Sequence, residues 1–472
     1  MCKGVDINYF APIEVNRFSI SSRKYLAYMD QIRIMSSFTI ILFSLLISGC
    51  QPPGKTNVSI DGDKWVINKS VINKSTPSEG LLMNIRMVNS VFEDRGDKMP
   101  EKFHGFDPEM NTETFISKMP EYVSAGSNAF TISLQGGAPG YEGAVNTAFE
   151  SDGSMRMEYF DRVARVIKAA DANSSVVILS CFYQRQHSHG SALNTVGAIK
   201  NSLSNTVKWI KENNFQNVVL EVSNEYRHGG YRNWKDGKWL VSTKGQIELI
   251  ELAKLLHPAL PVGTSGMGNG SMNDSIARVA DYITIHFNNT ALEDYADKIK
   301  AVKKYGKPVI CNEDDKTGIE GANALLLSVI NKCGWGYMNS RQNQTIPFRF
   351  EGTSDDTAVY NMMKKASLTG FSFDEAAITQ PSLIITYPND GDIFRIDQKI
   401  NITWSYLFPD TSQTGIIHVL KNSKPLGVVE GNSRQYPVQL SDEGIWNIEF
   451  VVMDKDGEEL LRSPKVDIIV RK

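Results

Sequence analysis

The sequence of 472 residues contains few cysteines, only five, and they are too scattered for a disulfide scaffold or a zinc site. Its formal net charge is −3, so it lacks the basic excess that would favour a nucleic-acid partner. No glycine-rich phosphate loop follows the first predicted strand, and no Gly-x-Ser-x-Gly motif follows any strand. These absences disfavour a nucleotide-binding open sheet and a hydrolase with a Ser-His-Asp triad.

An apolar stretch near the amino terminus, Ser36 to Gly49, is too short to span a bilayer comfortably. It ends at Cys50, and the letters ISGC resemble a bacterial lipobox, in which cleavage precedes a cysteine that is then lipidated. Residues 1–50 are therefore predicted to be an upstream segment and a lipoprotein signal peptide, followed at 51–74 by a linker and a leading strand segment. The predicted location is outside the cytoplasm, on an outer membrane, a cell surface or in a periplasm. An ordinary signal peptide or an uncleaved anchor is the alternative.

Between residues 75 and 372, apolar runs of strand length alternate with helical patterns. A typical helical stripe is Phe115, Met119 and Tyr122, and Ser354 is predicted to cap the last helix. The eight predicted strands are 81–88, 129–134, 176–182, 218–222, 261–264, 282–287, 308–311 and 333–338. Eight strands alternating with helices over about 300 residues predict an α/β fold of the (β/α)8 TIM-barrel type. A doubly wound open sheet is the structural alternative.

The composition changes after residue 380. Apolar residues alternate with polar ones, as in Trp446, Ile448 and Phe450, and Asp454 to Gly457 reads as a hairpin turn. About 90 residues of short strands without helices predict an immunoglobulin-like or fibronectin-like β-sandwich at 380–472.

Two glutamates end predicted strands of the barrel. The fourth strand runs into Asn224 and Glu225, and the seventh runs into Asn312, Glu313 and two aspartates. Chemistry in such barrels collects at the carboxyl ends of the strands, so these side chains are predicted to meet across the mouth. A retaining glycosidase needs two carboxyl groups, one as acid/base and one as nucleophile, and an asparagine can bind the 2-hydroxyl of the sugar.

This arrangement resembles clan A of the glycoside hydrolases, the barrel group that includes cellulases and mannanases. The resemblance covers roughly residues 59 to 370, and it implies that Glu225 is the acid/base and Glu313 the nucleophile. It also implies that Asn224 binds a hydroxyl, that His286 lies near the nucleophile, and that Trp335 forms the aromatic floor of the first sugar subsite.

The sequence departs from the clan in three ways. The arginine expected at the end of strand two is missing from TISLQGG, and Arg86 on strand one is predicted to substitute for it. Phe287, Asn288 and Asn289 stand where a tyrosine is expected after strand six. The run NEDD leaves Asp314 or Asp315 as a rival for the role of nucleophile.

Two loops after strands three and four are rich in aromatic, basic and amide groups. Tyr183 and Tyr226 are predicted to stack on sugar faces, and His187 is predicted to bind hydroxyls or acidic substituents. Nearby arginines leave an anionic sugar open as substrate. The His-x-His pair at 187 and 189 has no third ligand at convincing spacing, so neither a metal nor another cofactor is predicted.

The sequence therefore predicts an exported retaining glycoside hydrolase that cleaves β-linked bonds. Its predicted partners are a poly- or oligosaccharide substrate and a membrane, reached through a lipid on Cys50, with no nucleic acid. Two alternatives remain open at this point: a non-catalytic glycan-binding lipoprotein, and an adhesion protein in which the sandwich is the working part.

Overall fold

A computed structural model describes residues 56–96, 99–138, 141–184, 193, 195–370, 382–388, 391–407, 415–429 and 435–472. Among these residues, no helix combines the length and the apolar character that crossing a membrane requires. The predicted signal segment and Cys50 lie outside the described residues, as do His187 and its neighbours in the loop at 185–190.

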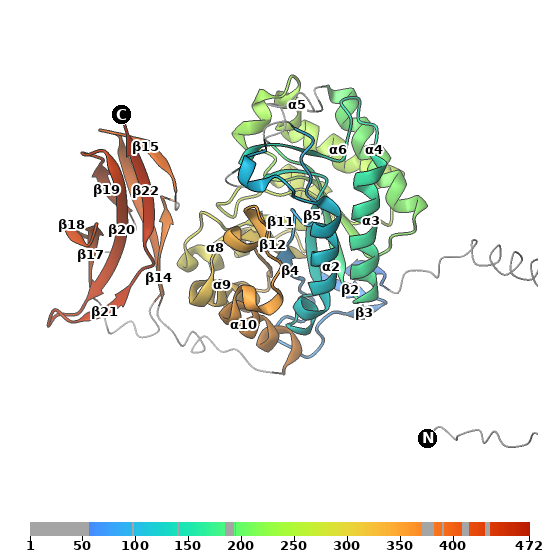
Figure 1. The fold of residues 1–472 in the computed structure, drawn as a ribbon. Helices are drawn as coiled ribbons and strands as arrows, with labels where there is room; N and C mark the ends of the chain where they lie inside the picture. The colour runs from blue at the N-terminus through green and yellow to red at the C-terminus, as the bar shows by residue number, and fades with distance from the viewer. Residues whose placement is uncertain are drawn as a thin grey trace, which may run out of the picture. The chain divides into compact units, whose positions relative to one another are not determined.

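Eight parallel strands form one sheet that curves into a barrel (Figure 1). Each contains a stretch predicted as a strand, so all eight predictions are confirmed. In chain order the strands are β4 (Met83–Arg86), β5 (Ala129–Ser133), β8 (Val176–Phe182), β9 (Val218–Ser223), β10 (Val262–Gly263), β11 (Ile283–His286), β12 (Val309–Asp314) and β13 (Gly334–Tyr337). Their order across the sheet is β10-β9-β8-β5-β4-β13-β12-β11.

The ring closes between the two outermost strands, β10 and β11. Ser265, just beyond β10, forms a parallel bridge with Thr284 of β11. The amide of Gly266 donates a hydrogen bond of 3.2 Å to the carbonyl of Thr284. The sheet is therefore a nearly closed barrel, and the open-sheet alternative is wrong.

Helices follow the strands and cover the outside of the barrel (Figure 1). They are α2 (Pro108–Ser124), α3 (Met157–Ala172), α4 (Val196–Glu212), α5 (Gly237–Leu240), α6 (Thr243–Leu256), α7 (Asp274–Val279), α8 (Tyr295–Lys303), α9 (Gly318–Ile330) and α10 (Thr357–Leu368). The predicted stripe of Phe115, Met119 and Tyr122 is fully buried in the core. The prediction that Ser354 caps the last helix is wrong, because the side chain of Asp356 accepts the hydrogen bond from the amide of Val359.

The amino-terminal end of the barrel is covered by a small antiparallel sheet of β1 (Val58–Asp61), β2 (Lys64–Ile67) and β3 (Ser70–Val71). Trp65 in this sheet contacts Tyr282 inside the barrel, with ring centroids 5.2 Å apart. The segment predicted as a linker with a leading strand therefore contains a folded three-stranded cover. At the opposite end, β6 (Gln135–Ala138) and β7 (Tyr141–Thr147) form a hairpin after β5.

The carboxyl-terminal part forms a β-sandwich, as predicted. One sheet has the order β14-β16-β19, and the other has the order β15-β22-β20-β17-β18, with β21 paired to β20. The two sheets share an apolar core in which the rings of Trp404 and Phe450 lie 4.7 Å apart. The strands are β14 (Ser382–Tyr387), β15 (Ile393–Arg395), β16 (Lys399–Leu407), β17 (Ile416–Lys421), β18 (Lys424–Val428), β19 (Gln435–Gln439), β20 (Gly444–Met453), β21 (Glu459–Arg462) and β22 (Val466–Arg471).

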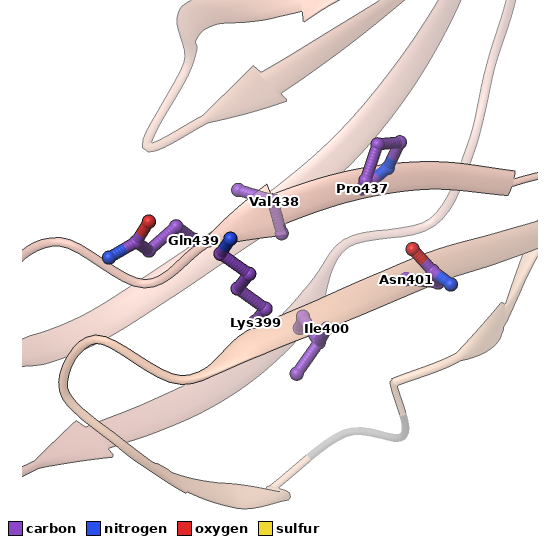
Figure 2. A pocket seen from close by; sticks show the side chains of 6 residues that line it. All are labelled: Lys399, Ile400, Asn401, Pro437, Val438 and Gln439. Carbon is purple, nitrogen blue, oxygen red and sulfur yellow. The ribbon is translucent and has the colours of Figure 1, made fainter.

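A shallow hollow of about 360 Å³ lies over two paired strands of the sandwich, β16 and β19 (Figure 2). It is lined by Lys399, Ile400, Asn401, Pro437, Val438 and Gln439. None of these six side chains is aromatic, so this hollow offers no ring on which a sugar face would stack.

Candidate active site

The two predicted glutamates meet at the carboxyl-terminal mouth of the barrel. Glu225 follows β9, and Glu313 lies near the end of β12. Nδ1 of His286, at the end of β11, lies 3.5 Å from Oε1 of Glu225 and 3.6 Å from Oε2 of Glu313. One oxygen of each carboxylate lies within 4.8 Å of the other, so both carboxylates face the same small volume.

Glu313 is buried and held by positive and hydrogen-bonding groups. A terminal nitrogen of Arg86, on β4, lies 2.8 Å from Oε2 of Glu313, and the amide of Asn288 donates a hydrogen bond of 2.6 Å to Oε1. Burial alone would raise the pKa of Glu313, but Arg86, then His286, then the Asn288 hydrogen bond outweigh it and hold the pKa below its usual value of 4.5. The surroundings therefore favour the ionised carboxylate.

Arg86 also orients the predicted hydroxyl-binding asparagine. The guanidinium nitrogen that faces Glu313 donates a hydrogen bond of 2.8 Å to Oδ1 of Asn224. The amide nitrogen of Asn224 then points to Oε1 of Gln184, at 3.4 Å. Because its oxygen is engaged by Arg86, the NH2 group of Asn224 is the part left to donate to a ligand.

His286 is completely buried between the two carboxylates. Burial lowers the pKa of its imidazole, but Glu313 and Glu225 outweigh burial and raise it above the usual 6.5. The histidine therefore carries more positive charge near neutral pH than an ordinary histidine would.

The backbone at Glu225 turns sharply out of β9. Glu225 has φ of +45°, an uncommon value for a residue with a side chain. Its amide donates a hydrogen bond of 2.8 Å to Oγ of Ser265, and the amide of Tyr226 donates one of 3.2 Å to the carbonyl of the same serine. These bonds hold a conformation that costs free energy and that directs the carboxylate of Glu225 into the mouth.

A cavity of about 140 Å³ opens between these groups. Five predicted site residues line it, namely Arg86, Tyr183, Asn224, Glu225 and Glu313. Gln184, an amide of the loop after strand three that was also predicted to bind hydroxyls, lines it as well. The lining residues that were not predicted are Val88, Ser133, Gln135, Gly136, Met338, Ser340 and Gln344. Most of these lie at or just after the ends of β4, β5 and β13, so position at a strand end was a signal that would have found them.

Trp335 does not line this cavity, which corrects the prediction of an aromatic floor at this residue. Its side chain is fully buried and its Nε1 donates a hydrogen bond of 2.8 Å to Oδ2 of Asp314. Asp314 also accepts from the hydroxyl of Tyr295 at 2.6 Å and pairs with Lys316 at 3.1 Å. Asp314 is thus occupied in the core, and Glu313 is the carboxylate of the run NEDD that faces the mouth cavity.

Tyr226 is also placed away from the mouth cavity. It is almost fully buried and lines a second cavity of about 340 Å³, formed with Arg227 and the loop from Gly266 to Asp274. The positive φ at Glu225 sends the chain away from the mouth immediately after the catalytic candidate. The stacking role predicted for Tyr226 is therefore not supported by its position.

The carboxylates of Glu225 and Glu313 and the imidazole of His286 also have a spacing that a metal ion would accept. The charge at this place does not fit a metal, because the cationic Arg86 already lies 2.8 Å from Glu313. A second cation there would be repelled by the guanidinium.

No protein-family model matches the chain. No curated protein matches it either. Among solved structures, a putative glycoside hydrolase from Bacteroides vulgatus shares 12% identity over 88% of this chain and 82% of its own, with a TM-score of 0.45. A GH5-4 broad specificity endoglucanase from Clostridium longisporum shares 11% identity over 63% of this chain and 99% of its own, with a TM-score of 0.44.

β-Glucuronidase 2 from Bacteroides uniformis shares 10% identity over 88% of this chain, with a TM-score of 0.42. The match covers 48% of that enzyme, so the chain spans about half of its length. An endoglucanase, a β-glucuronidase and a putative glycoside hydrolase are thus among the structures that this chain resembles.

Proposed function

We propose that this chain is a retaining glycoside hydrolase that cleaves β-linked bonds in a poly- or oligosaccharide. The observation that carries the proposal is the pair Glu225 and Glu313, whose nearest oxygens lie within 4.8 Å across the barrel mouth. Carboxyl groups of retaining glycosidases lie roughly 5–5.5 Å apart, whereas inverting enzymes separate them by roughly 6.5–9.5 Å. The separation is close to the retaining range and shorter than the spacing of inverting enzymes, which hold both the sugar and the attacking water between their carboxyl groups.

In the first step, Oε2 or Oε1 of Glu313 attacks the anomeric carbon and forms a covalent bond to it. The bond from that carbon to the leaving oxygen breaks, and Glu225 gives its proton to this oxygen. The pKa of Glu313 is held low by Arg86 and its neighbours, so the nucleophile is ionised. The NH2 group of Asn224 hydrogen-bonds the 2-hydroxyl, a contact that strengthens as positive charge develops on the ring.

In the second step, Glu225 takes a proton from water, and the water oxygen attacks the anomeric carbon. The bond to Glu313 breaks, which restores its carboxylate and releases a sugar with the original anomeric configuration. The two steps together consume one water and yield two sugar products, and they need no cofactor.

The first test is release of reducing sugar from a panel of neutral and acidic β-linked polysaccharides by the chain from residue 51 onward. Glu225→Gln and Glu313→Gln should each lose nearly all release, while Glu212→Gln, a change on the exposed face of α4, should release as much as the parent. Release by both site variants at the parental rate would contradict the assignment. Binding to one glycan without any release would instead identify the non-catalytic glycan-binding alternative.

The stereochemistry is tested separately. Proton NMR of the first product formed from the glycan that the panel identifies should show the β-anomer before mutarotation. Initial formation of the α-anomer would exclude a retaining mechanism.

We also propose that the protein is exported and anchored by a lipid on Cys50, because the apolar stretch at 36–49 ends in the lipobox-like ISGC. Expressed in a bacterium, the full chain should take up labelled palmitate and partition into detergent, and Cys50→Ala should do neither. Labelling of the alanine variant at the parental level would contradict the proposal.

A further inference from the structure

Two consecutive residues of β12 turn their side chains into the barrel. Nδ2 of Asn312 donates a hydrogen bond of 3.3 Å to Oε1 of Glu221 inside the ring, while Glu313 contacts Arg86 and His286 at the mouth. Consecutive residues of a regular strand point to opposite faces of the sheet. A regular β12 would therefore turn Glu313 outward, toward the helices.

The pairing of β12 with both neighbours contains one extra residue at this point. Toward β11, Cys311 pairs with Ile285 and the next pair is Glu313 with His286, so Asn312 has no partner. Toward β13, Cys311 pairs with Trp335, and the next pair is Asp314 with Tyr337. Between these two pairs the chain moves three residues along β12 but only two along β13. This is a β-bulge at Asn312, and a bulge re-aims the side chains that follow it.

The neighbouring strand makes room for the bulge with a glycine. A Cβ at Gly336 would lie 2.6 Å from Cα of Asn312 and 2.7 Å from the carbonyl oxygen of Cys311. Both contacts are with backbone atoms, which cannot rotate away as a side chain would. The bulged backbone of β12 therefore occupies the space that any side chain at 336 would need.

Polar side chains inside the barrel hold the bulge from below. The amide of Asn84 on β4 donates to the carbonyl of Asn312 at 3.4 Å, and Oγ1 of Thr131 on β5 donates to Oδ1 of Asn84 at 3.1 Å. Glu221 on β9, which accepts from Asn312, is fully buried. The interior of such a barrel is usually filled by branched apolar residues, so these hydrogen bonds are an uncommon use of that space.

We propose that Asn312, supported by Glu221 and accommodated by Gly336, is a positioning residue that turns Glu313 into the mouth. Asn312 contacts none of the reacting atoms. It acts through Glu313, which the bulge places opposite His286 in the pairing of β12 with β11. The catalytic consequence rests on the proposed function, but the positioning itself does not.

The positioning is tested without a substrate by NMR titration of His286, assigned by comparison with His286→Gln. Glu313 is the largest of the charges that raise the pKa of His286. Gly336→Ala should flatten or shift the bulge, move Glu313 away, and lower the pKa of His286. The matched control is Val219→Ala, which also changes a side chain in the barrel interior. Val219 belongs to an apolar layer with Val176 and Ile310, and its replacement should leave the pKa of His286 unchanged.

Two variants of Glu221 keep the test decisive where Gly336→Ala does not fold. Glu221→Gln retains an oxygen that accepts from Asn312 and should keep the parental pKa of His286. Glu221→Leu removes the acceptor and should lower that pKa. A folded Gly336→Ala or Glu221→Leu protein with the parental pKa of His286 would overturn the proposal.

The catalytic consequence is measured on the glycan that the panel identifies. Gly336→Ala and Glu221→Leu should lower kcat by about 100-fold, since a misplacement of about 1 Å can have that effect, with KM nearly unchanged. Val219→Ala should leave kcat at the parental value, and so should the conservative Glu221→Gln. Equal kcat values in Val219→Ala and Gly336→Ala would contradict the positioning role. A parent that hydrolyses no glycan would count against the proposed function, while the titration of His286 would still decide the positioning.

Discussion

A single guanidinium nitrogen of Arg86 lies 2.8 Å from Oε2 of Glu313 and 2.8 Å from Oδ1 of Asn224. The predicted nucleophile and the predicted hydroxyl-binding residue are therefore fixed by the same group. Because both contacts are buried, neither can be exchanged for water without cost. Arg86 links the charge of Glu313 to the orientation of Asn224.

Replacing Arg86 with methionine should change the pH dependence of the reaction. The substitution removes the largest of the effects that lower the pKa of Glu313 and leaves burial, which raises it. In the parent, the stability that the ionised Glu313 contributes is present above the usual pKa of 4.5 and is lost as pH falls through the lower folded value. The acidic limb of kcat/KM should therefore move to higher pH in Arg86→Met, with activity reduced by about 100-fold or more.

The stability of the same variant provides a second check. Arg86→Met should lower the free energy of unfolding at neutral pH by about 3 kcal/mol, because it leaves a buried carboxylate without its partner. The double variant Arg86→Met with Glu313→Gln should recover part of this loss. No recovery in the double variant would show that the pair is not coupled.

His286→Gln should alter the pH dependence of stability. The folded pKa of His286 is raised, so its stabilising contribution is fully present below the usual value of 6.5 and is lost as pH rises through the folded pKa. Chemical denaturation should show the parent more stable than His286→Gln at about pH 6, with the difference smaller at about pH 9.

His257 supplies the control for this measurement. Burial, and then Lys211, lower the pKa of His257 below 6.5. Its removal should therefore favour the fold at low pH, which is the opposite trend. The same trend in both variants would contradict the assigned direction for His286.

Asp315→Asn should stabilise the protein at neutral pH. Burial raises the pKa of Asp315 from 3.8 to about 6, with Lys316 opposing and Asp314 and Glu313 adding to the rise. Ionising this carboxyl costs free energy in the folded protein as pH rises from the unfolded value of 3.8 through about 6. The asparagine variant should be more stable than the parent above that range, by up to about 3 kcal/mol at about 1.4 kcal/mol for each pKa unit, and no more stable below about pH 4. A gain that is equal at both pH values would exclude titration as its cause.

Trp335→Phe should change stability and leave recognition of the glycan intact. The variant loses the hydrogen bond to Asp314, which then lacks one of its buried donors, at a cost of about 1–3 kcal/mol. KM and kcat on the glycan should stay within about twofold of the parent. A large rise in KM with little loss of stability would instead support the aromatic floor that the sequence predicted.

The fold was predictable from the sequence because its signals are local. Apolar runs such as Val176 to Phe182 are strands whose residues are all buried, and the polar residues that end β9 and β12 indicated the candidate site. The orientation of Trp335 was not predictable in the same way. Gly334 and Gly336 on either side of it face a crowded barrel interior, so the tryptophan faces the helices.

Other features depend on contacts between distant parts of the chain. The bulge at Asn312 is defined by pairing with β11 and β13, which no single segment of sequence encodes. The last helix was assigned the wrong cap because Ser354 and Asp356 are both good caps, and only the three-dimensional path of the backbone selects the aspartate.

Ser265 takes part in two different tasks. Its backbone forms the bridge to Thr284 that completes the ring. Its hydroxyl oxygen accepts a hydrogen bond from the backbone amide of Glu225, the residue with the uncommon positive φ. Any substitution of Ser265 therefore affects both the closure of the barrel and the orientation of Glu225, the proposed acid/base. A change at this one serine is therefore expected to alter the stability of the barrel and the proposed activity together.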